Sequence, residues 1–265
     1  MGGLILPLEG EAGAWPPGVH SFDSRPLFPG FLPDWVNNYV AQALVAALLV
    51  ILFWLWMARG QKVVPGRKQT IGEMAYDLIR NGIARDIIGH DFHKFVPYLM
   101  AIFSFILVNN LFGETFFFML PTFSDIGFVY GLALLTWALY IGVGIKKWGF
   151  FGYLKQATLP AGVPPFLWIL IIPLEFLSNI IVRPITLALR LFANMFAGHL
   201  VVLVFVTGGW ILIQTLEPFY VAAGSLSIVF SFAIFALELL VGFIQAYIFT
   251  VLTAQYVASS LAEDH

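Results

Sequence analysis

The chain has 265 residues, of which 60% are hydrophobic and 11% charged, and its mean hydropathy is +0.89. This composition excludes a soluble globular domain and selects a protein that crosses a membrane several times. A net charge of −2 gives no reason to expect a nucleic-acid partner. The absence of cysteine excludes disulfides, thiolate metal sites and thiol nucleophiles, and we expect neither a cofactor nor a resident metal ion.

Continuous apolar runs of about 20 residues predict membrane-crossing helices rather than a β-barrel, because lipid-exposed backbone must form its hydrogen bonds within its own segment. We expect an all-α polytopic protein in which residues 34–265 form a single membrane domain. Residues 1–33 are rich in glycine and proline and lack the basic start and apolar run of a cleavable signal, so we expect a loosely ordered extramembrane arm. The five predicted spans are about 36–58, 95–113, 127–145, 166–208 and 219–258.

A sixth helix is predicted over about residues 70–89, where the apolar residues recur at helical spacing with charged residues between them. Ile71, Met74 and Leu78 lie on one face of this helix. The pattern favours an amphipathic helix lying on the membrane surface. The alternative is a solvated helix of a small extramembrane domain, but few residues surround it to bury its apolar face.

The distribution of Lys and Arg predicts how the chain crosses the membrane. Seven cations lie between Arg59 and Lys94 and three between Lys146 and Lys155, whereas the opposite side has only Arg25. Because cytoplasmic loops carry the excess of Lys and Arg, the amino terminus is expected outside and the carboxyl terminus inside. We expect a bacterial plasma membrane, with an organellar energy-coupling membrane as the alternative.

The apolar region from residue 166 to about 207 is too long for one perpendicular helix. About 42 residues make roughly 63 Å of helix, against a hydrocarbon core of about 30 Å. We expect one long, strongly tilted helix, bent near Pro173 and Pro184 and ending at Gly208-Gly209, rather than two short spans. The last long helix would then return beside it as an antiparallel hairpin.

The segment LRLFANMFAGH, Leu189 to His199, places one guanidinium within this apolar region. A permanent charge at membrane depth costs from about 3 to more than 10 kcal/mol, so it persists where a partner or a water-filled cavity receives it. Arg190 is therefore the first functional candidate; a structural cation held by Gln245 is the alternative. Arg183 is closer to the inner end of the helix, where its side chain can reach the membrane surface.

An antiparallel hairpin can be tested by its polar residues. If Arg190 is level with Gln245 and His199 with Glu238, both pairs require a turn near residue 218, where Glu217-Pro218 is found. At 100° per residue, however, His199 lies about 180° from Arg190, so both pairs cannot meet along one straight line of contact between the helices. Steep crossing of the helices, local bending near residue 198, or an Arg190 that points toward a third element would resolve this difference.

The same segments resemble a known family. LRLFANMFAGH, the preceding Arg183-Pro184-Ile185-Thr186, the later Leu237-Glu238, and the runs GFIQAYIFTVLTAQY and GIKKWGFFGYLKQAT are similar to subunit a of F-type ATP synthases. The resemblance extends over most of the chain after the amino-terminal arm. It implies the membrane stator of a rotary proton channel, with no catalytic site of its own, and no phosphate-binding loop is present in the sequence.

The resemblance also implies roles for individual residues. Arg190 matches the essential arginine at the interface with a rotor ring, and it would control deprotonation of the ring carboxylates and prevent a direct proton leak. His199 and Glu238 match a polar pair in the outer half-channel, and Glu175 resembles an acid of the inner one, although it precedes Arg190 by fifteen residues, one more than expected. The remaining residues of the implied pathway are Asn194, Gln245, Ser178, Glu114 and Asp125.

The implied partners are a ring of c-subunit proteolipids, b-type subunits of the peripheral stalk, the remaining ATP synthase subunits and membrane lipid. Some alternatives stay open at this point. His199 and Glu238 can form a static buried ion pair, and Glu114 and Asp125 can belong to a wetted outer loop. A proton-coupled secondary transporter of an anionic substrate is the rival function; it predicts inverted repeats, which we do not find in the sequence.

Overall fold

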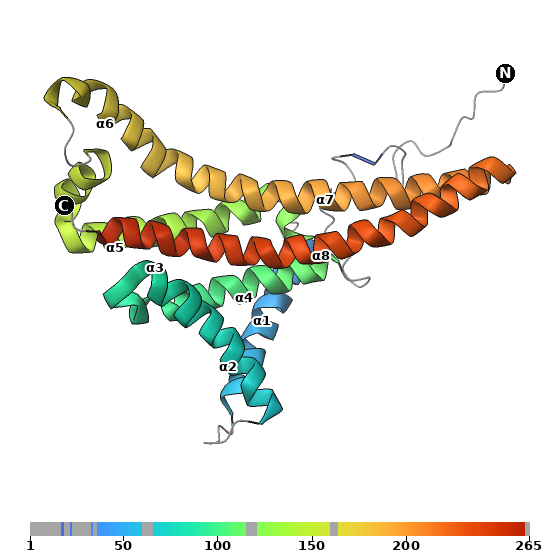
Figure 1. Cartoon of the computed structure of the whole chain (residues 1–265), viewed down its shortest axis with the longest axis horizontal. Coiled ribbons are helices and arrows are strands. Elements are labelled where there is room, and N and C mark those ends of the chain that lie inside the picture. Colours follow the sequence, from blue (N-terminus) through green and yellow to red (C-terminus); the bar gives the residue numbers. More distant parts are fainter. Residues whose placement is uncertain are drawn as a thin grey trace. The chain divides into compact units, whose positions relative to one another are not determined.

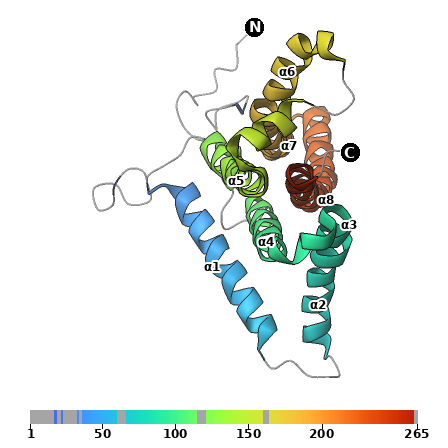
Figure 2. The ribbon, with the colours of Figure 1, turned by 90° about the vertical axis from the view of Figure 1, so that its left-hand side faces the viewer.

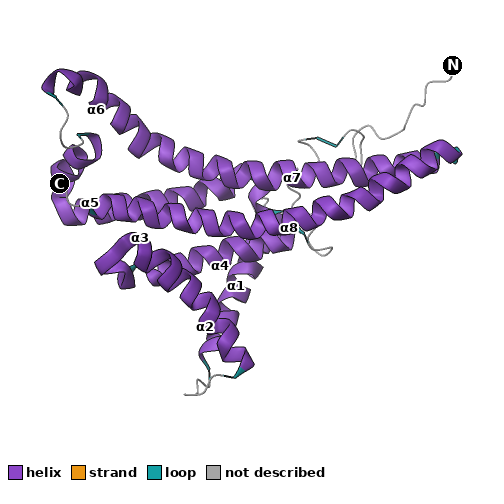
Figure 3. Ribbon diagram, in the orientation of Figure 1, coloured by secondary structure: helices purple, strands orange, loops and turns teal. Residues whose placement is uncertain are grey.

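The computed structural model describes residues 17–18, 22, 33, 36–59, 66–114, 121–159 and 164–262. Most of the predicted arm, residues 1–33, lies outside these residues. The described chain is almost wholly helical (Figure 3). Its main helices are α1 Asn38–Ala58, α2 Arg67–Ile79, α3 Asp86–Ile88, α4 Val96–Gly113, α5 Ile126–Thr158, α6 Trp168–Phe176, α7 Arg183–Gln214 and α8 Pro218–Leu261.

Five helical segments in the described part of the chain are long and apolar enough to cross a membrane, with α6 and α7 counted as one segment of 47 residues. Contacts divide the chain into two compact units. The first contains Met1–Ala43, Asn109–Asp125 and Ala193–Phe243, and the second contains Leu44–Val108, Ile126–Phe192 and Ile244–His265. The predicted class, an all-α polytopic membrane protein with five crossing helices, is confirmed.

Helix α1 exposes large apolar side chains, as expected of a helix that faces lipid. Asn37 caps its first turn, since the Asn37 Oδ1 accepts a hydrogen bond from the Val40 backbone N–H at 3.0 Å. Large apolar side chains such as Leu44 and Ile51 are 66% and 57% exposed. Exposed apolar surface of this extent is what hydrocarbon rather than water accommodates. The Trp54 indole N–H fixes α1 to α4 by donating to the Ser104 hydroxyl at 3.0 Å.

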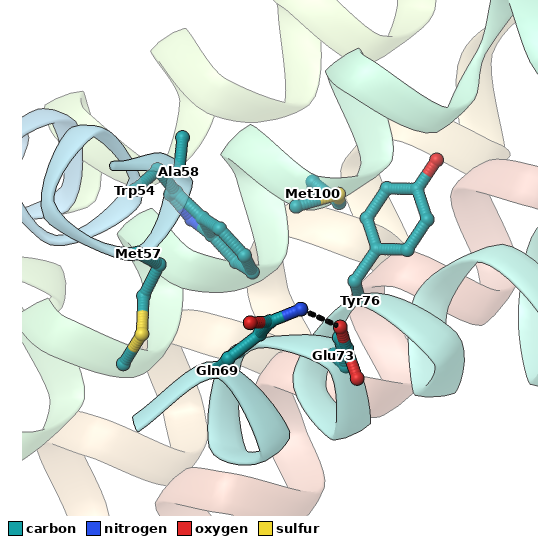
Figure 4. Close-up of a pocket in the computed structure, with 8 residues that line it drawn as sticks. Trp54, Met57, Ala58, Gln69, Glu73, Tyr76 and Met100 are labelled. Atoms are coloured by element: carbon teal, nitrogen blue, oxygen red, sulfur yellow. Dashed lines mark hydrogen bonds between the residues drawn. The ribbon is translucent and has the colours of Figure 1, made fainter. Parts of the chain in front are cut away.

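Helix α2 corresponds to the predicted surface helix but begins and ends earlier. A π-helical turn, Arg80–Arg85, and a 3₁₀ segment, Gly89–Lys94, continue the chain to α4. Ile71 and Met74 of α2 are 58% and 68% exposed, which gives the helix the outward apolar face that an interfacial position requires. Helices α1, α2 and α4 enclose a cavity of about 370 Å³ (Figure 4), lined by Trp54, Met57, Ala58, Gln69, Gly72, Glu73, Tyr76 and Met100.

Helix α5 is longer than the predicted span of 127–145. It continues to Thr158 through a kink at Gly149, whose φ of 72° is a conformation that side chains disfavour. Beyond the kink, the Tyr153 ring packs directly against Gly144, where a Cβ would overlap it. Lys146, Lys147 and Lys155 therefore lie on helix, not on a loop.

The bend expected between Pro173 and Pro184 is present as a π-helical turn, Leu177–Val182, that joins α6 to α7. Figure 1 shows α6 turning away from the axis of α7. Pro184 has no N–H to donate to the carbonyl of Ile180, four residues earlier. That carbonyl instead accepts a hydrogen bond from the Trp137 indole of α5 at 2.9 Å, and the Asn179 carbonyl accepts one from the Tyr140 hydroxyl at 2.9 Å. The two-span alternative is not observed.

Helices α7 and α8 form the expected antiparallel hairpin and lie side by side in Figures 1 and 2. The expected end of the first helix at Gly208-Gly209 is wrong, because α7 continues to Gln214. Gly209 instead lies at a close backbone contact between the two helices, and a Cβ on Gly224 would be 2.5 Å from the Gly209 carbonyl oxygen. Small residues permit such backbone contact in membranes. The turn follows at Leu216, which adopts a φ of 58°.

We predict that Gly224→Ala destabilises the hairpin by about 1–3 kcal/mol, because the new methyl group would meet backbone that cannot move aside alone. Gly142→Ala is the matched control, since a Cβ on Gly142 would have nothing within 4 Å. Alanine is the better helix former by about 1 kcal/mol, so the control should be neutral or stabilising. Thermal unfolding of the two purified variants distinguishes these outcomes, and equal melting temperatures would contradict the proposed close contact.

Candidate functional site

Arg190 lies on α7 with its side chain exposed, while its neighbours Leu187, Ala188 and Leu191 are buried against the rest of the chain. Among the described residues, no ion pair or hydrogen bond involves the Arg190 side chain. A guanidinium in an apolar helix without a counter-ion is costly for an isolated chain. Arg190 therefore faces outward, toward whatever surrounds the subunit.

Gln245 lies on α8, and Asn194 lies on α7, four residues after Arg190. Gln245 is 2% exposed and Asn194 is half-buried, whereas Arg190 is exposed.

Three of the predicted residues form a cluster. Glu114 follows the end of α4, His199 lies on α7 and Glu238 on α8, and one ligand atom of each lies within 4.8 Å of the others. Glu238 is 7% exposed, and neither of its carboxylate oxygens has a hydrogen-bond partner among the described residues. Glu114, which lies beyond α4, is part-buried, and burial raises the pKa of its carboxyl. The hairpin register predicted that His199 is level with Glu238, and the structure places ligand atoms of these two side chains within 4.8 Å of each other.

Residues that the sequence did not single out shape this cluster. A Cβ at Gly198 would overlap the Glu238 carboxylate, so the glycine provides the space that this carboxylate occupies. The buried Phe22 ring lies edge-on to His199, with ring centroids 6.0 Å apart. Asn110 is buried in α4, where its amide donates to the Gly242 carbonyl at 2.8 Å and ties α4 to α8. Gly198 lies within the motif LRLFANMFAGH, but nothing in the sequence indicates that it makes space for Glu238, and nothing marks Phe22.

The other predicted residues are placed elsewhere. Glu175 lies on α6, half-buried, where its Oε2 accepts a hydrogen bond from the Asn179 amide at 2.9 Å. Ser178 is exposed on the π-helical turn that follows. Asp125 is half-buried just before α5, and it is not a member of the cluster formed by Glu114, His199 and Glu238.

Comparison with known proteins shows which family this chain resembles. The family model described as ATP synthase A chain matches residues 40–258. The chain belongs to the ATP synthase A chain family. It is 46% identical to ATP synthase subunit a of a Nocardioides species, over 99% of this chain and 98% of that protein. It is also 40% identical to ATP synthase subunit a of Pseudarthrobacter chlorophenolicus and of Paenarthrobacter aurescens, over 98% of each chain.

The family match includes all the residues considered above except Phe22, from Glu114 to Gln245. The resemblance to this family that LRLFANMFAGH indicated is thereby confirmed. Five apolar helices and full-length similarity to bacterial members make this a multi-pass membrane protein of the ATP synthase A chain family.

Proposed function

We propose that this chain is the proton-translocating stator subunit of an F-type ATP synthase in a bacterial plasma membrane. It would provide two offset half-channels to a rotor ring of proteolipid hairpins, each with a carboxyl at mid-membrane. The observation that carries the proposal is the exposed Arg190, for which the described chain supplies no counter-ion. The counter-ion is then a carboxylate of another subunit, which arrives and leaves as the ring turns.

The surface around Arg190 supports this role. The residues of α7 at helical spacing on either side, Thr186, Ala193 and Ala197, are small and exposed. Small side chains allow a partner helix to approach closely in a membrane. A ring helix can therefore bring its carboxyl to the guanidinium without displacing bulky side chains.

The electrostatic action of Arg190 follows from its permanent charge. A ring carboxyl that faces lipid keeps its proton because desolvation disfavours the ionised form, whereas a nearby guanidinium favours that form. A carboxyl that reaches Arg190 therefore releases its proton to one half-channel and is reloaded from the other. The same positive charge repels a proton that would cross directly between the half-channels.

In the outer half-channel, protons would pass Glu114 or Asp125 to reach His199 and Glu238. The cluster contains an imidazole, a group that changes its charge near neutral pH, beside two carboxyls that can accept or release a proton. The inner half-channel would pass Glu175 and Ser178. The excess of Lys and Arg in the segments around Arg59–Lys94 and Lys146–Lys155 supports an amino terminus outside and a carboxyl terminus in the cytoplasm.

The energy of this transport must be used on other subunits. Each proton that crosses 100 mV delivers about 2.3 kcal/mol, so several crossings are needed for one nucleotide phosphorylation. The sequence has no phosphate-binding loop, which assigns that chemistry to the catalytic subunits of the complex. The b-type subunits of the peripheral stalk would hold this chain stationary against the ring.

Cysteine cross-linking tests the proposed ring interface, and the native chain contains no cysteine to interfere. We expect Ala193→Cys to form a disulfide with a cysteine placed beside the ring carboxyl when the purified complex is oxidised. Leu52→Cys is the matched control, because Leu52 is 50% exposed on α1 but outside the proposed interface. Cross-linking at Leu52 without cross-linking at Ala193 would contradict the proposal.

A further inference from the structure

Asn179 lies in the π-helical turn Leu177–Val182 that joins α6 to α7, and its side chain connects two other parts of the chain. The Asn179 amide donates one hydrogen bond to the Ala157 carbonyl near the end of α5 at 2.6 Å, and another to the Glu175 carboxylate of α6 at 2.9 Å. An amide nitrogen carries two hydrogens, so both donors of this side chain are used. Within the part of the chain that the structure describes, Asn179 alone donates a hydrogen bond to Glu175.

The backbone of the same turn is held from α5. Pro184 deprives the turn of one N–H donor, which leaves carbonyls to be satisfied from outside the helix. The Asn179 carbonyl accepts a hydrogen bond from the Tyr140 hydroxyl at 2.9 Å. The next carbonyl, that of Ile180, accepts one from the Trp137 indole at 2.9 Å. Because Tyr140 is only 1% exposed, the main chain of Asn179 is fixed to a buried side chain and its amide has a defined direction.

The cations nearest in the chain do not hold the Glu175 carboxylate. The Arg183 guanidinium lies 5.1 Å from the centre of the Tyr256 ring of α8, and Lys155 is exposed on α5. Neither forms an ion pair with Glu175 among the described residues. The orientation of this half-buried carboxylate therefore depends on the Asn179 amide, which binds Oε2 and leaves Oε1 available for a proton.

We propose that Asn179 is a positioning residue of the inner half-channel, whose amide, anchored on α5, holds the Glu175 carboxylate where it exchanges protons with the cytoplasmic side. Asn179 carries no proton itself and acts through Glu175. The π-helical turn then has a purpose, since such turns are frequent at functional sites and this one directs a side chain between two helices. The inference rests on the proposed function, because it assigns Asn179 to the half-channel that Glu175 would form.

ATP-driven proton pumping in inverted membrane vesicles, whose cytoplasmic side faces the medium, tests the proposal. Asn179→Leu replaces the amide by an apolar group of similar size, and it should slow the initial rate by about tenfold, the order expected for loss of a hydrogen bond to a charged group. Asn179→Gln retains an amide and should recover part of that rate. Ile181→Ala is the matched control, because Ile181 is 41% exposed on the same turn, and it should pump like the native complex. A leucine variant as fast as the native complex, or faster than the glutamine variant, would overturn the proposal.

A double-mutant cycle separates positioning from a structural role and from failure of the proposed function. Glu175→Gln should itself slow pumping, and Asn179→Leu should add no further loss in that background, because its effect passes through the carboxylate. Losses that multiply would contradict the positioning role of Asn179 while leaving the role of Glu175 intact. Native pumping by Glu175→Gln would instead refute both roles.

Tyr140→Phe provides a second variant that removes a single hydroxyl, in case the leucine variant does not assemble. It should slow pumping less than Asn179→Leu does, and it should likewise have no effect in the Glu175→Gln background. Native pumping by Tyr140→Phe, or a loss that persists in that background, would contradict the anchoring of Asn179 on α5.

Discussion

Replacement of Arg190 by alanine is expected to abolish ATP-driven proton pumping. Without the guanidinium, a ring carboxyl loses the nearby positive charge that favours its ionised form, and the protonated ring site would keep its proton. Removal of one opposite charge changes the proton affinity of a carboxyl by about one to three orders of magnitude. That range corresponds to about 1.4–4 kcal/mol, since each tenfold change is about 1.4 kcal/mol. Fluorescence quenching in inverted membrane vesicles measures the pumping.

Arg183→Ala is the matched control for this experiment. Arg183 lies on the same helix, seven residues before Arg190, and its guanidinium is placed over the Tyr256 ring at 5.1 Å, within the chain itself. A cation–π contact of this kind contributes about 0.5–2 kcal/mol to packing, so Arg183→Ala should retain much of the pumping activity. Normal pumping by Arg190→Ala, or equal loss in both variants, would contradict the proposed role of Arg190.

Exchange of the polar pair gives the second large effect. His199→Glu and Glu238→His are each expected to lose most of the ATP-driven proton transport. The first variant leaves three carboxyls in the cluster, and the second leaves two imidazoles with one carboxyl. The double variant restores one imidazole and one carboxyl in the same space, beside the unchanged Glu114. We expect it to retain more transport than either single variant, which is the coupling that a double-mutant cycle measures.

The design of the exchange separates a proton relay from a static ion pair. A purely structural pair would show the same pattern in the thermal stability of the complex as in transport. A relay predicts a recovery of transport that exceeds the recovery of stability, so melting temperatures must be measured on the same preparations. Equal loss of transport in the two single variants and the double variant would argue against coupling between His199 and Glu238.

Several features of the fold could be predicted from the sequence because they depend on local periodicity. Runs of apolar residues specified the five spans, and Pro173 and Pro184 indicated the bend between α6 and α7. The structure adds why the bend is tolerated, since Trp137 and Tyr140 hydrogen-bond the carbonyls that the π-helical turn and Pro184 leave open. The boundary at Gly208-Gly209 was wrong because glycine ends helices in water but serves as a packing residue between membrane helices.

The hairpin register was predictable for a different reason. Polar residues are rare on α7 and α8, and helical rise is constant, so one assumed turn near Glu217-Pro218 placed His199 level with Glu238. The structure brings these two residues together. The hairpin register could not place Glu114 beside this pair, because Glu114 precedes His199 by 85 residues and follows another helix; only the family resemblance put it on the same pathway.

The sequence by itself determined that this protein crosses a membrane and made Arg190 the first functional candidate, because hydrophobic length and the cost of a buried charge are properties of a single segment. Only the tertiary structure decided where the charge points, with its neighbours buried and its own side chain exposed. It also decided that an imidazole and two carboxyls share one site. Such contacts depend on how three helices pack, and helix packing is set by shape and close approach at residues such as Gly198 and Gly209 rather than by the periodicity of any one helix.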